Sequence, residues 1–284
     1  MTPLRRKMID AMIMKGFAAN TQEAYLRAMI QLVRHYRRSP DTLDRDQIQA
    51  YLLYLIKEKH LSPASCRQAM HGILFFYLHV LQRPLDDLTL DYPKVPQRIP
   101  ELLSPAEVAL IIQSCANLKH RTMLAVCYGA GLRVSELVAL KVRDIDSAQG
   151  YLRIEQGKGA KDRHALLTPC LLKQLRHYWL KYRPQSILFY SADDRATALT
   201  SNAIQRVYRA AKNKAGIEKI GGIHSLRHAF ATHQLAAGVP LHELQHLLGH
   251  QNIHSTQRYI HWLPACRPGL GKGCDLLQEV LSDD

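Results

Sequence analysis

Residues 131–137 read GLRVSEL and place Arg133 just after a glycine-containing break in an apolar stretch, where a helix is expected to begin. A side chain at the end of a helix can project toward a ligand. Glu136 lies three residues further on, so a surface salt bridge worth roughly 0.3 kcal/mol would explain the pair equally well. The local motif leaves both interpretations open. The residues that favour one of them lie far downstream.

Three downstream motifs supply groups that could cleave a phosphodiester without a metal ion. Residues 224–227 read HSLR, residues 248–250 read LGH, and Tyr259 follows. A tyrosine hydroxyl can attack phosphorus, while two guanidiniums can hold the charge of the non-bridging oxygens through planar, bidentate hydrogen bonds. Imidazoles add hydrogen bonds and proton transfer. His224 and Arg227 are three residues apart on a predicted helix, so they share one face.

Taken together, these motifs resemble the signature of the phage integrase family of tyrosine recombinases, an Arg in a GLRxxEL context followed by HxxR, LGH and Tyr. The resemblance covers roughly residues 10–262. It implies two phosphate-clamping arginines, a lysine general acid and a tyrosine nucleophile, with Glu136 as a supporting residue. It also makes His224 a hydrogen-bonding and proton-handling residue, and His250 a hydrogen-bond donor to the phosphate. In chain order these catalytic residues are Arg133, Lys158, His224, Arg227, His250 and Tyr259.

Each of these residues also has a plain structural interpretation. Tyr259 could be an interfacial aromatic residue, as most tyrosines are. A phenol has an ordinary pKa of about 10, so it attacks phosphorus only from an electropositive pocket. The other residues of the set would create such a pocket around Tyr259. His250 follows a glycine that is expected to end a helix, so its imidazole could bond the last carbonyls of that helix. His228 and His233 match no motif position and are expected to be surface or core residues.

The assignment of the lysine rests on the resemblance alone. Lys158 lies between two glycines in a predicted turn between strands, where a lysine is usually only solvated. In the family, a lysine of the corresponding β-hairpin is the general acid that protonates the departing 5′ oxygen. Lys158 fits that position better than Lys161, but the sequence leaves the choice between them open.

Charge and composition agree with a protein that binds double-stranded DNA. The 284 residues carry a formal net charge of +14, with 15 Lys and Arg against nine Asp and Glu in residues 1–98, and 23 against 15 in the rest. Both parts are basic, as expected if both contact a polyanion, although a merely soluble basic protein is the bland alternative. The six cysteines have no metal-binding or disulfide spacing, and no apolar run could span a membrane. We therefore expect no cofactor, metal or membrane association, and a cytoplasmic, nucleoid-associated location.

The hydrophobic periodicity predicts a mainly α protein with a small antiparallel β-sheet. Residues 1–90 are expected to form a helical DNA-binding domain, which the resemblance makes a SAM-like core-binding domain. Asn20, Asp44 and Ser62 are predicted to open successive helices of this domain. Residues 91–100 contain three prolines and are predicted to be a linker, because proline disfavours helix and keeps the chain extended.

Residues 101–264 are predicted to form a mixed α+β catalytic domain. Three short alternating runs at 142–146, 151–155 and 163–167 predict a three-stranded antiparallel sheet. Helices are expected at about residues 104–115, 121–141 with a break at the glycines, 169–182, 201–215, 224–237, 240–248 and around Tyr259.

A rival interpretation comes from residues 242–246, which read HELQH and match the HExxH pattern of zinc hydrolases. The third histidine of the extended motif should stand where Asn252 is found, and His250 comes too early. A zinc site would also leave the basic charge and the arginines unexplained. We therefore interpret His242, Glu243 and His246 as the exposed face of a short helix.

The resemblance implies a metal- and ATP-independent site-specific recombinase that forms a 3′-phosphotyrosyl intermediate. It also implies a tetramer on paired DNA sites, with accessory recombination proteins as further candidate partners. Two alternatives are DNA relaxation of the type IB topoisomerase kind and a DNA-binding protein that has lost cleavage. The sequence does not distinguish integration, excision, resolution and transposition.

Residues 265–284 are predicted to be a C-terminal arm. This segment holds two basic and four acidic residues, which reverses the sign of the rest of the chain, so we do not expect it to lie on DNA. Its apolar residues would form one stripe of a helix too short to be stable unless it docks. We expect the arm to pack on another protomer, while packing on its own domain or disorder stay open. The stripe consists of Leu276, Leu277, Val280 and Leu281.

Overall fold

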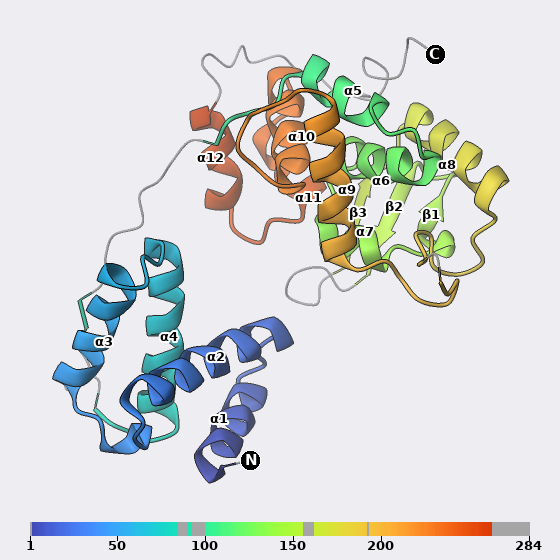
Figure 1. Cartoon of the computed structure of the whole chain (residues 1–284). Coiled ribbons are helices and arrows are strands. Elements are labelled where there is room, and N and C mark those ends of the chain that lie inside the picture. Colours follow the sequence, from blue (N-terminus) through green and yellow to red (C-terminus); the bar gives the residue numbers. More distant parts are fainter. Residues whose placement is uncertain (1, 85–89, 92–99, 156–161, 192, 263–284) are drawn as a thin grey trace. The chain divides into compact units, whose positions relative to one another are not determined.

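The structure is a computed structural model, and it describes residues 2–84, 90–91, 100–155, 162–191 and 193–262. The chain divides into two compact units, Met1–Arg98 and Ile99–Asp284, which we call the N-terminal and C-terminal units (Figure 1). Helices dominate both units, and one small antiparallel sheet lies in the C-terminal unit. The predicted fold class is therefore confirmed. The predicted arm at 265–284 and most of the predicted linker lie outside the described residues.

The described part of the N-terminal unit contains four α-helices and a 3₁₀ turn at Pro40–Thr42. Two helix starts were predicted correctly. The side chain of Asp44 accepts a hydrogen bond from the backbone amide of Gln47 at 2.8 Å, and Ser62 caps the next helix in the same way. The helices are α1 (Pro3–Met14), α2 (Ala19–Tyr36), α3 (Arg45–Lys57) and α4 (Pro63–His79).

The predicted helix start at Asn20 is wrong. Helix α2 already begins at Ala19, with Ala18 as its N-cap and no side-chain cap. The side chain of Gln22 instead donates a hydrogen bond to the carbonyl of Phe17 at 2.7 Å, and so stabilises the entry into the helix. Helix α2 therefore forms without a side-chain cap, and the packing of its apolar residues in the core supplies most of its stability.

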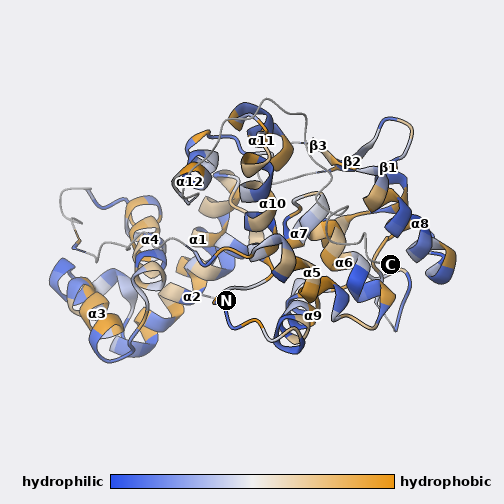
Figure 2. Ribbon diagram, turned by 90° about the horizontal axis from the view of Figure 1, so that it is seen from above, coloured by the Kyte–Doolittle hydropathy of each residue, from blue (hydrophilic) through white to orange (hydrophobic). Residues whose placement is uncertain are grey.

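One apolar core holds the N-terminal unit together. Helices α2 and α4 pack along each other, and their apolar stripes meet those of α1 and α3. Figure 2 shows hydrophobic residues along α3 and α4. Aromatic and sulfur-containing side chains of this unit pack together in this core. Its fully buried members include Met12, Leu32, Ile48, Cys66, Ile73 and Tyr77.

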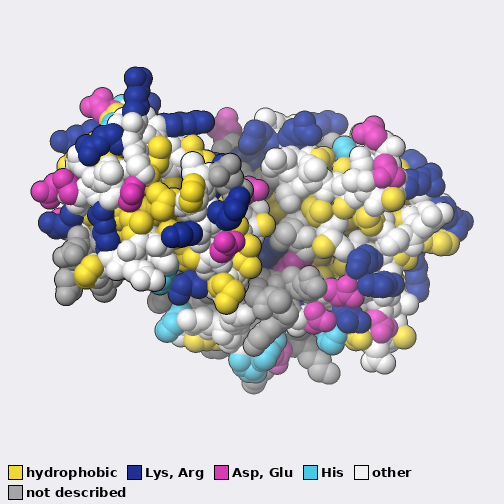
Figure 3. Space-filling view, turned by 90° about the horizontal axis from the view of Figure 1, so that it is seen from below, with side chains coloured by type: hydrophobic (Ala, Val, Ile, Leu, Met, Phe, Trp, Pro, Cys, Tyr) yellow, Lys and Arg dark blue, Asp and Glu magenta, His cyan; other side chains and the backbone are white. Residues whose placement is uncertain are grey.

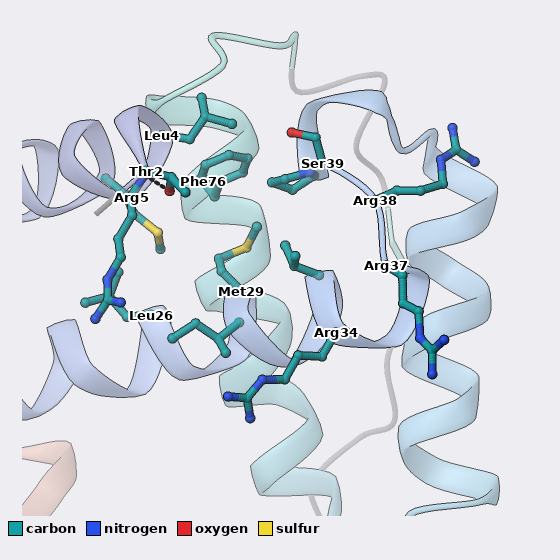
Figure 4. A pocket seen from close by; sticks show the side chains of 14 residues that line it. Thr2, Leu4, Arg5, Leu26, Met29, Arg34, Arg37, Arg38, Ser39 and Phe76 are labelled. Atoms are coloured by element: carbon teal, nitrogen blue, oxygen red, sulfur yellow. Dashed lines mark hydrogen bonds between the residues drawn. The ribbon is translucent and has the colours of Figure 1, made fainter.

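A groove of about 720 Å³ opens on the N-terminal unit between α1, α2 and the turn that follows α2. Figure 4 shows apolar side chains such as Met29 and Phe76 on its floor, while the guanidiniums of four arginines extend from its rim. These arginines concentrate positive charge around one opening. They are Arg5, Arg34, Arg37 and Arg38.

The described part of the C-terminal unit contains a small antiparallel sheet of order β1-β2-β3, and α11 packs against β3. Ile145 pairs with Leu152, and Leu152 pairs with Ala165. The first strand is shorter than predicted, because Val142–Asp144 forms a 3₁₀ turn in which the side chain of Asp144 accepts from the amide of Lys141. The strands are β1 (Ile145–Asp146), β2 (Tyr151–Ile154) and β3 (Arg163–Leu166).

The helices of this unit agree with the predicted ones to within a few residues at most ends. The first of them was predicted to begin at about residue 104, and there Ser104 and Glu107 form a capping box. In chain order the helices are α5 (Pro105–Gln113), α6 (Leu118–Gly129), α7 (Val134–Ala139), α8 (Pro169–Tyr182), α9 (Ser201–Lys214), α10 (His224–Ala236), α11 (Leu241–Leu248) and α12 (His254–Trp262). No helix in the described part of the chain is long and apolar enough to cross a membrane.

Helix α6 lies at the centre of the C-terminal unit, where α5, α7, α8, α9 and α10 pack against it. Its residues from Thr122 onward are all buried. The chain leaves α6 through Gly131, whose φ of +60° favours glycine, and a Cβ there would lie 2.5 Å from the ring of Phe230 on α10. This close approach brings Arg133, at the start of α7, next to Arg227 on α10.

We predict that Gly131→Ala destabilises the protein more than Gly150→Ala does. Both glycines have a positive φ, which costs alanine roughly 1–2 kcal/mol. Only the new methyl at 131 would also clash with Phe230, because the nearest atom at 150 is the Leu167 carbonyl oxygen at 3.8 Å. The clash should add roughly 1–3 kcal/mol. Denaturant unfolding measures the difference, and equal losses would show that α6 and α10 are not tightly packed at this point.

Candidate active site

One pocket of about 390 Å³ in the C-terminal unit collects most of the residues that the sequence singled out. The residues come from segments far apart in the chain: the start of α7, α10, the end of α11 and α12. Lys158 and its alternative Lys161 lie outside the described residues. The predicted residues that line the pocket are Arg133, His224, Arg227, His250 and Tyr259.

Arg133 forms the expected salt bridge with Glu136 and also lines the pocket. Its guanidinium donates to Glu136 Oε1 at 2.6 Å, and its backbone amide donates to Oε2 at 2.8 Å. The Glu136 side chain is only 4% exposed, and it also accepts a bond of 2.7 Å from Arg163 on β3. Burial alone would raise the pKa of Glu136, but Arg163, helped by Arg133 and Arg227, holds it below its usual value.

Arg227 is fixed by backbone carbonyls from two other segments. Its side chain is 1% exposed, and its terminal nitrogens donate to the carbonyl of Gly131 at 2.5 Å and to that of Leu248 at 2.6 Å. Burial, and then the charges of Arg133 and Arg163, lower the pKa of Arg227 to about 9, which leaves it charged at neutral pH. The pocket therefore holds a positive charge in one orientation before any ligand binds.

His250 lies at the end of α11, and its tautomer follows from its partners. Arg227 donates to its Nε2 at 3.2 Å, so Nδ1 carries the hydrogen and donates to the hydroxyl of Thr256 at 2.8 Å. Burial, and then the charge of Arg227, lower the pKa of His250 to about 3, so the ring is neutral. The backbone amide of His250, not its imidazole, bonds a carbonyl of α11, that of Gln245.

Gly249 shapes the turn between α11 and His250. Its φ is +61°, and a Cβ at this position would lie 2.2 Å from the side chain of Arg163. The side chain of Arg163 also donates to the carbonyl of Leu247. The same arginine therefore touches the end of α11 and holds Glu136, which links the two sides of the pocket. Sequence analysis missed Arg163, because a single arginine in a short strand carries no motif.

The hydroxyl of Tyr259 lies inside the pocket wall rather than in solvent. Tyr259 is 2% exposed, and its oxygen lies 3.2 Å from Nδ1 of His228. Burial raises the pKa of the phenol, although the charges of Arg227 and Arg258 oppose this rise. The predicted electropositive surroundings are therefore present. In the free protein these charges lower the pKa of the phenol less than burial raises it.

His228 corrects the expectation that it would be an unassigned surface or core residue. It lines the pocket, and its ring meets that of His224 at 4.6 Å between centroids. A sequence signal existed, because His228 follows His224 by four residues on one helix and therefore shares its face. His233 has a structural role outside the pocket, with its Nδ1 2.9 Å from the hydroxyl of Tyr128 and its Nε2 2.9 Å from the Leu103 carbonyl.

The HExxH pattern gains no support from the geometry. His242, Glu243 and His246 are all exposed on α11, whose buried residues are Leu244 and Leu248. Among the residues that the structure describes, no group of three or more His, Cys, Asp or Glu side chains is placed to hold a metal ion. The three residues of the pattern lie on the polar face of an amphipathic helix, as predicted.

With this geometry defined, the relatives of the chain can be compared. The sequence model of the phage integrase family matches residues 100–265, and that of the phage integrase N-terminal SAM-like domain matches residues 4–87. The chain belongs to the phage integrase family. The two matches fall on the C-terminal and N-terminal units respectively.

Named relatives agree with this membership. "Putative integrase/recombinase y4qK" of Sinorhizobium fredii (strain NBRC 101917 / NGR234) is 42% identical over 263 residues, which cover 92% of this chain and 84% of that protein. "Tyrosine recombinase XerD" of Staphylococcus aureus (strain N315) is 30% identical over 270 residues, covering 88% of this chain and 90% of that one. The protein is therefore a tyrosine recombinase, an enzyme that transfers DNA strands in site-specific recombination.

Solved structures share the fold. The crystal structure of XerA recombinase has 28% identity and a TM-score of 0.53, and the match covers 91% of this chain and 92% of that one. A lambda integrase tetramer bound to a Holliday junction has 18% identity and a TM-score of 0.69, covering 90% and 76%. The second likeness is one of fold alone.

We predict that Glu136→Gln destabilises the protein by about 3 kcal/mol near pH 7, because it leaves buried guanidiniums without their counter-charge. The pKa of Glu136 is lowered in the folded state. Its stabilising contribution is therefore present above the unfolded-state value of about 4.3 and is lost as the pH falls through the folded-state pKa. Unfolding of both proteins from pH 7 to pH 3 should show the difference shrinking in acid.

Glu155→Gln is the matched control for this experiment. Glu155 also pairs with three cations, Lys141, Arg143 and Arg153, but it does so at the surface, where an ion pair contributes little. A loss at Glu155 as large as that at Glu136 would contradict the role given to burial.

Proposed function

We propose that Tyr259 is the nucleophile of this recombinase. Its hydroxyl oxygen would attack the scissile phosphate, form a 3′-phosphotyrosyl bond and release a 5′ hydroxyl. The main support is that Tyr259 shares one pocket with Arg133, His224, Arg227 and His250. A pocket that already holds charged and hydrogen-bonding groups in fixed positions requires little reorganisation in the transition state.

The two arginines would stabilise the charge on the non-bridging oxygens. Arg227 suits this role, because carbonyls of Gly131 and Leu248 hold its guanidinium in place while it stays charged. Arg133 suits it as well, because Glu136 fixes its orientation and its side chain remains 20% exposed toward the pocket. Guanidiniums offer planar, paired donors that match phosphate oxygens, so they would take the part that divalent metal plays in other phosphoryl transfers.

The histidines would complete the phosphate site. His224 lies exposed at the first turn of α10 and lines the pocket, where it could donate to a phosphate oxygen. His250 would donate as well once Arg227 releases its Nε2 and that nitrogen takes the hydrogen that Nδ1 carries in the free protein. Lys158 would protonate the departing 5′ oxygen. The phosphotyrosyl bond conserves the energy of the phosphodiester, so a partner strand could reseal it without ATP.

For the whole protein we propose domains at residues 1–90 and 101–264 that both contact duplex DNA, joined by a linker at 91–100. The arginine-rimmed groove of the N-terminal unit supports this, and so does the spread of Lys and Arg over the visible faces of both units (Figure 3). By analogy with the lambda integrase tetramer, four protomers would act on two DNA sites. Such an enzyme would work in the cytoplasm on the nucleoid, with integration or transposition as the outcome and accessory proteins as further partners.

Tyr259→Phe should abolish the covalent adduct on a nicked suicide substrate while leaving DNA affinity within a few fold, because it removes one oxygen and no charge. Gel electrophoresis under denaturing conditions detects the adduct. Tyr128→Phe is the control, since Tyr128 is a buried tyrosine of the same unit that also contacts a histidine. It should retain the adduct.

Persistence of the adduct in Tyr259→Phe would contradict the assignment of the nucleophile. Two other results would favour the alternatives. An adduct that relaxes supercoiled DNA but never joins two sites would favour a topoisomerase-like enzyme. Tight DNA binding with no adduct in the unaltered chain would favour a protein that has lost cleavage.

Lys158→Ala should slow cleavage of ordinary DNA by roughly 10²–10⁴-fold, the usual contribution of a general acid. A 5′-bridging phosphorothiolate substrate should restore the rate, because its sulfur leaves without a proton. Single-turnover cleavage of both substrates measures this. Lys161→Ala serves as the control, and rescue of that variant instead would transfer the role to Lys161.

Deletion of residues 268–284 should weaken synapsis of paired sites more than binding to a single half-site. The reason is that the acidic arm is proposed to pack on another protomer rather than on DNA. Gel-shift titrations on half-sites and on paired sites give the two affinities. A deletion variant that recombines at the normal rate would show that the arm is dispensable.

A further inference from the structure

The hydroxyl of Tyr259 has a specific partner that the proposed phosphate site does not use. His228 Nδ1 lies 3.2 Å from the phenol oxygen. Trp262 holds both rings from the side, with edge-on contacts of 5.2 Å to His228 and 5.0 Å to Tyr259 between ring centroids. The two residues come from α10 and α12, which pack against each other, so the contact is part of how α12 docks.

A phenol that attacks phosphorus must lose its proton, and the neighbouring histidines differ in their ability to accept it. Both nitrogens of His250 are already committed, Nε2 to Arg227 and Nδ1 to Thr256. His224 is exposed and lines the pocket, where it is already proposed to donate to a phosphate oxygen. His228 is the histidine whose ring nitrogen faces the phenol oxygen.

We propose that His228 is the general base that accepts the proton of Tyr259 during cleavage and returns it during resealing. This inference rests on Tyr259 being the nucleophile. In cleavage, the bond between the Tyr259 oxygen and phosphorus forms, the phosphorus–5′ oxygen bond breaks, and the phenol proton moves to His228 Nδ1. The 5′ oxygen takes a separate proton from the general acid, proposed to be Lys158. In resealing, His228 returns its proton to the departing Tyr259 oxygen.

The surroundings of His228 would prevent proton transfer from Tyr259 until DNA binds. Burial, and then His224, Arg227 and Arg258, lower the pKa of His228 to about 4, while burial raises the pKa of the phenol. Both groups are therefore neutral in the free protein. A phosphate bound beside Arg227 and Arg258 would bring negative charge that offsets these cations, and so favour the imidazolium that forms as the phenol attacks. Proton transfer to His228 would then be favourable when the DNA phosphate is bound in the pocket.

The same helix supplies a matched control. His233 on α10 also faces a tyrosine hydroxyl through Nδ1, at 2.9 Å from Tyr128, but this pair lies outside the pocket. His228→Ala and His233→Ala therefore remove equivalent histidine–tyrosine contacts from one helix. If His228 had a merely structural role, the two variants would affect the chemical step alike. If His228 is the general base, His228→Ala should slow the chemical step more than His233→Ala does.

The test is single-turnover cleavage and resealing by both variants in the full-length chain across pH 5 to 10. His228→Ala should slow both directions by roughly 10²–10⁴-fold and make the rate rise with pH as hydroxide replaces the base, while His233→Ala keeps the pH profile of the unaltered protein. Equal effects of the two variants would overturn the proposal.

A second measurement holds even if His228→Ala is poorly folded. Replacement of Tyr259 by a fluorinated tyrosine lowers the phenol pKa without removing the hydroxyl. In the unaltered chain the rate should change little, whereas in His228→Gln the fluorinated phenol should recover most of the lost rate, because it needs no base near neutral pH. Failure of that rescue, with the adduct still forming on residue 259, would overturn the role of His228 alone. Loss of the adduct from residue 259 in every chain would overturn the nucleophile instead.

Discussion

The arrangement of the C-terminal unit depends on the buried guanidinium of Arg227. It joins three segments that are distant in the chain, because it donates to the carbonyls after α6 and at the end of α11 while it sits on α10. Such a charge is costly to bury unless it is hydrogen-bonded and paired, and Glu136 lies 3.8 Å away as its counter-charge. The hydrogen bonds of Arg227 therefore serve both packing and chemistry, because they hold the three segments together and orient the guanidinium that is proposed to bind phosphate.

The electrostatic balance of the pocket follows from this arrangement. Glu136 neutralises part of the charge of Arg133, Arg163 and Arg227, which allows them to lie close together, yet a net positive field remains. Burial, and then that field, lower the pKa values of His228 and His250 and keep both rings neutral. A bound phosphate would supply the missing negative charge, so the free protein is complementary to a phosphodiester rather than to a neutral ligand.

The sequence predicted the architecture well where local signals and packing agree. Helix starts at Asp44, Ser62 and Ser104 follow from capping chemistry. The start predicted at Asn20 was wrong, because α2 begins at Ala19 without a side-chain cap and is stabilised by packing instead. The pocket residues came from spaced motifs that the family resemblance joined. His228 and Arg163 were missed because their significance lies in contacts between α10 and α12 and between β3 and α7, which no local pattern reveals. The pairing of Lys158 or Lys161 with the pocket stays a prediction.

The central claim is that the Tyr259 oxygen becomes covalently bonded to DNA phosphate inside the Arg133–Arg227 pocket. The most direct test traps the covalent complex on a suicide substrate in the presence of EDTA, digests protein and DNA, and sequences the nucleotide-bearing peptide by mass spectrometry. The account predicts a phosphonucleotide on Tyr259, formed at an undiminished rate without divalent metal. A modification on any other residue, or an adduct that requires metal, would contradict it.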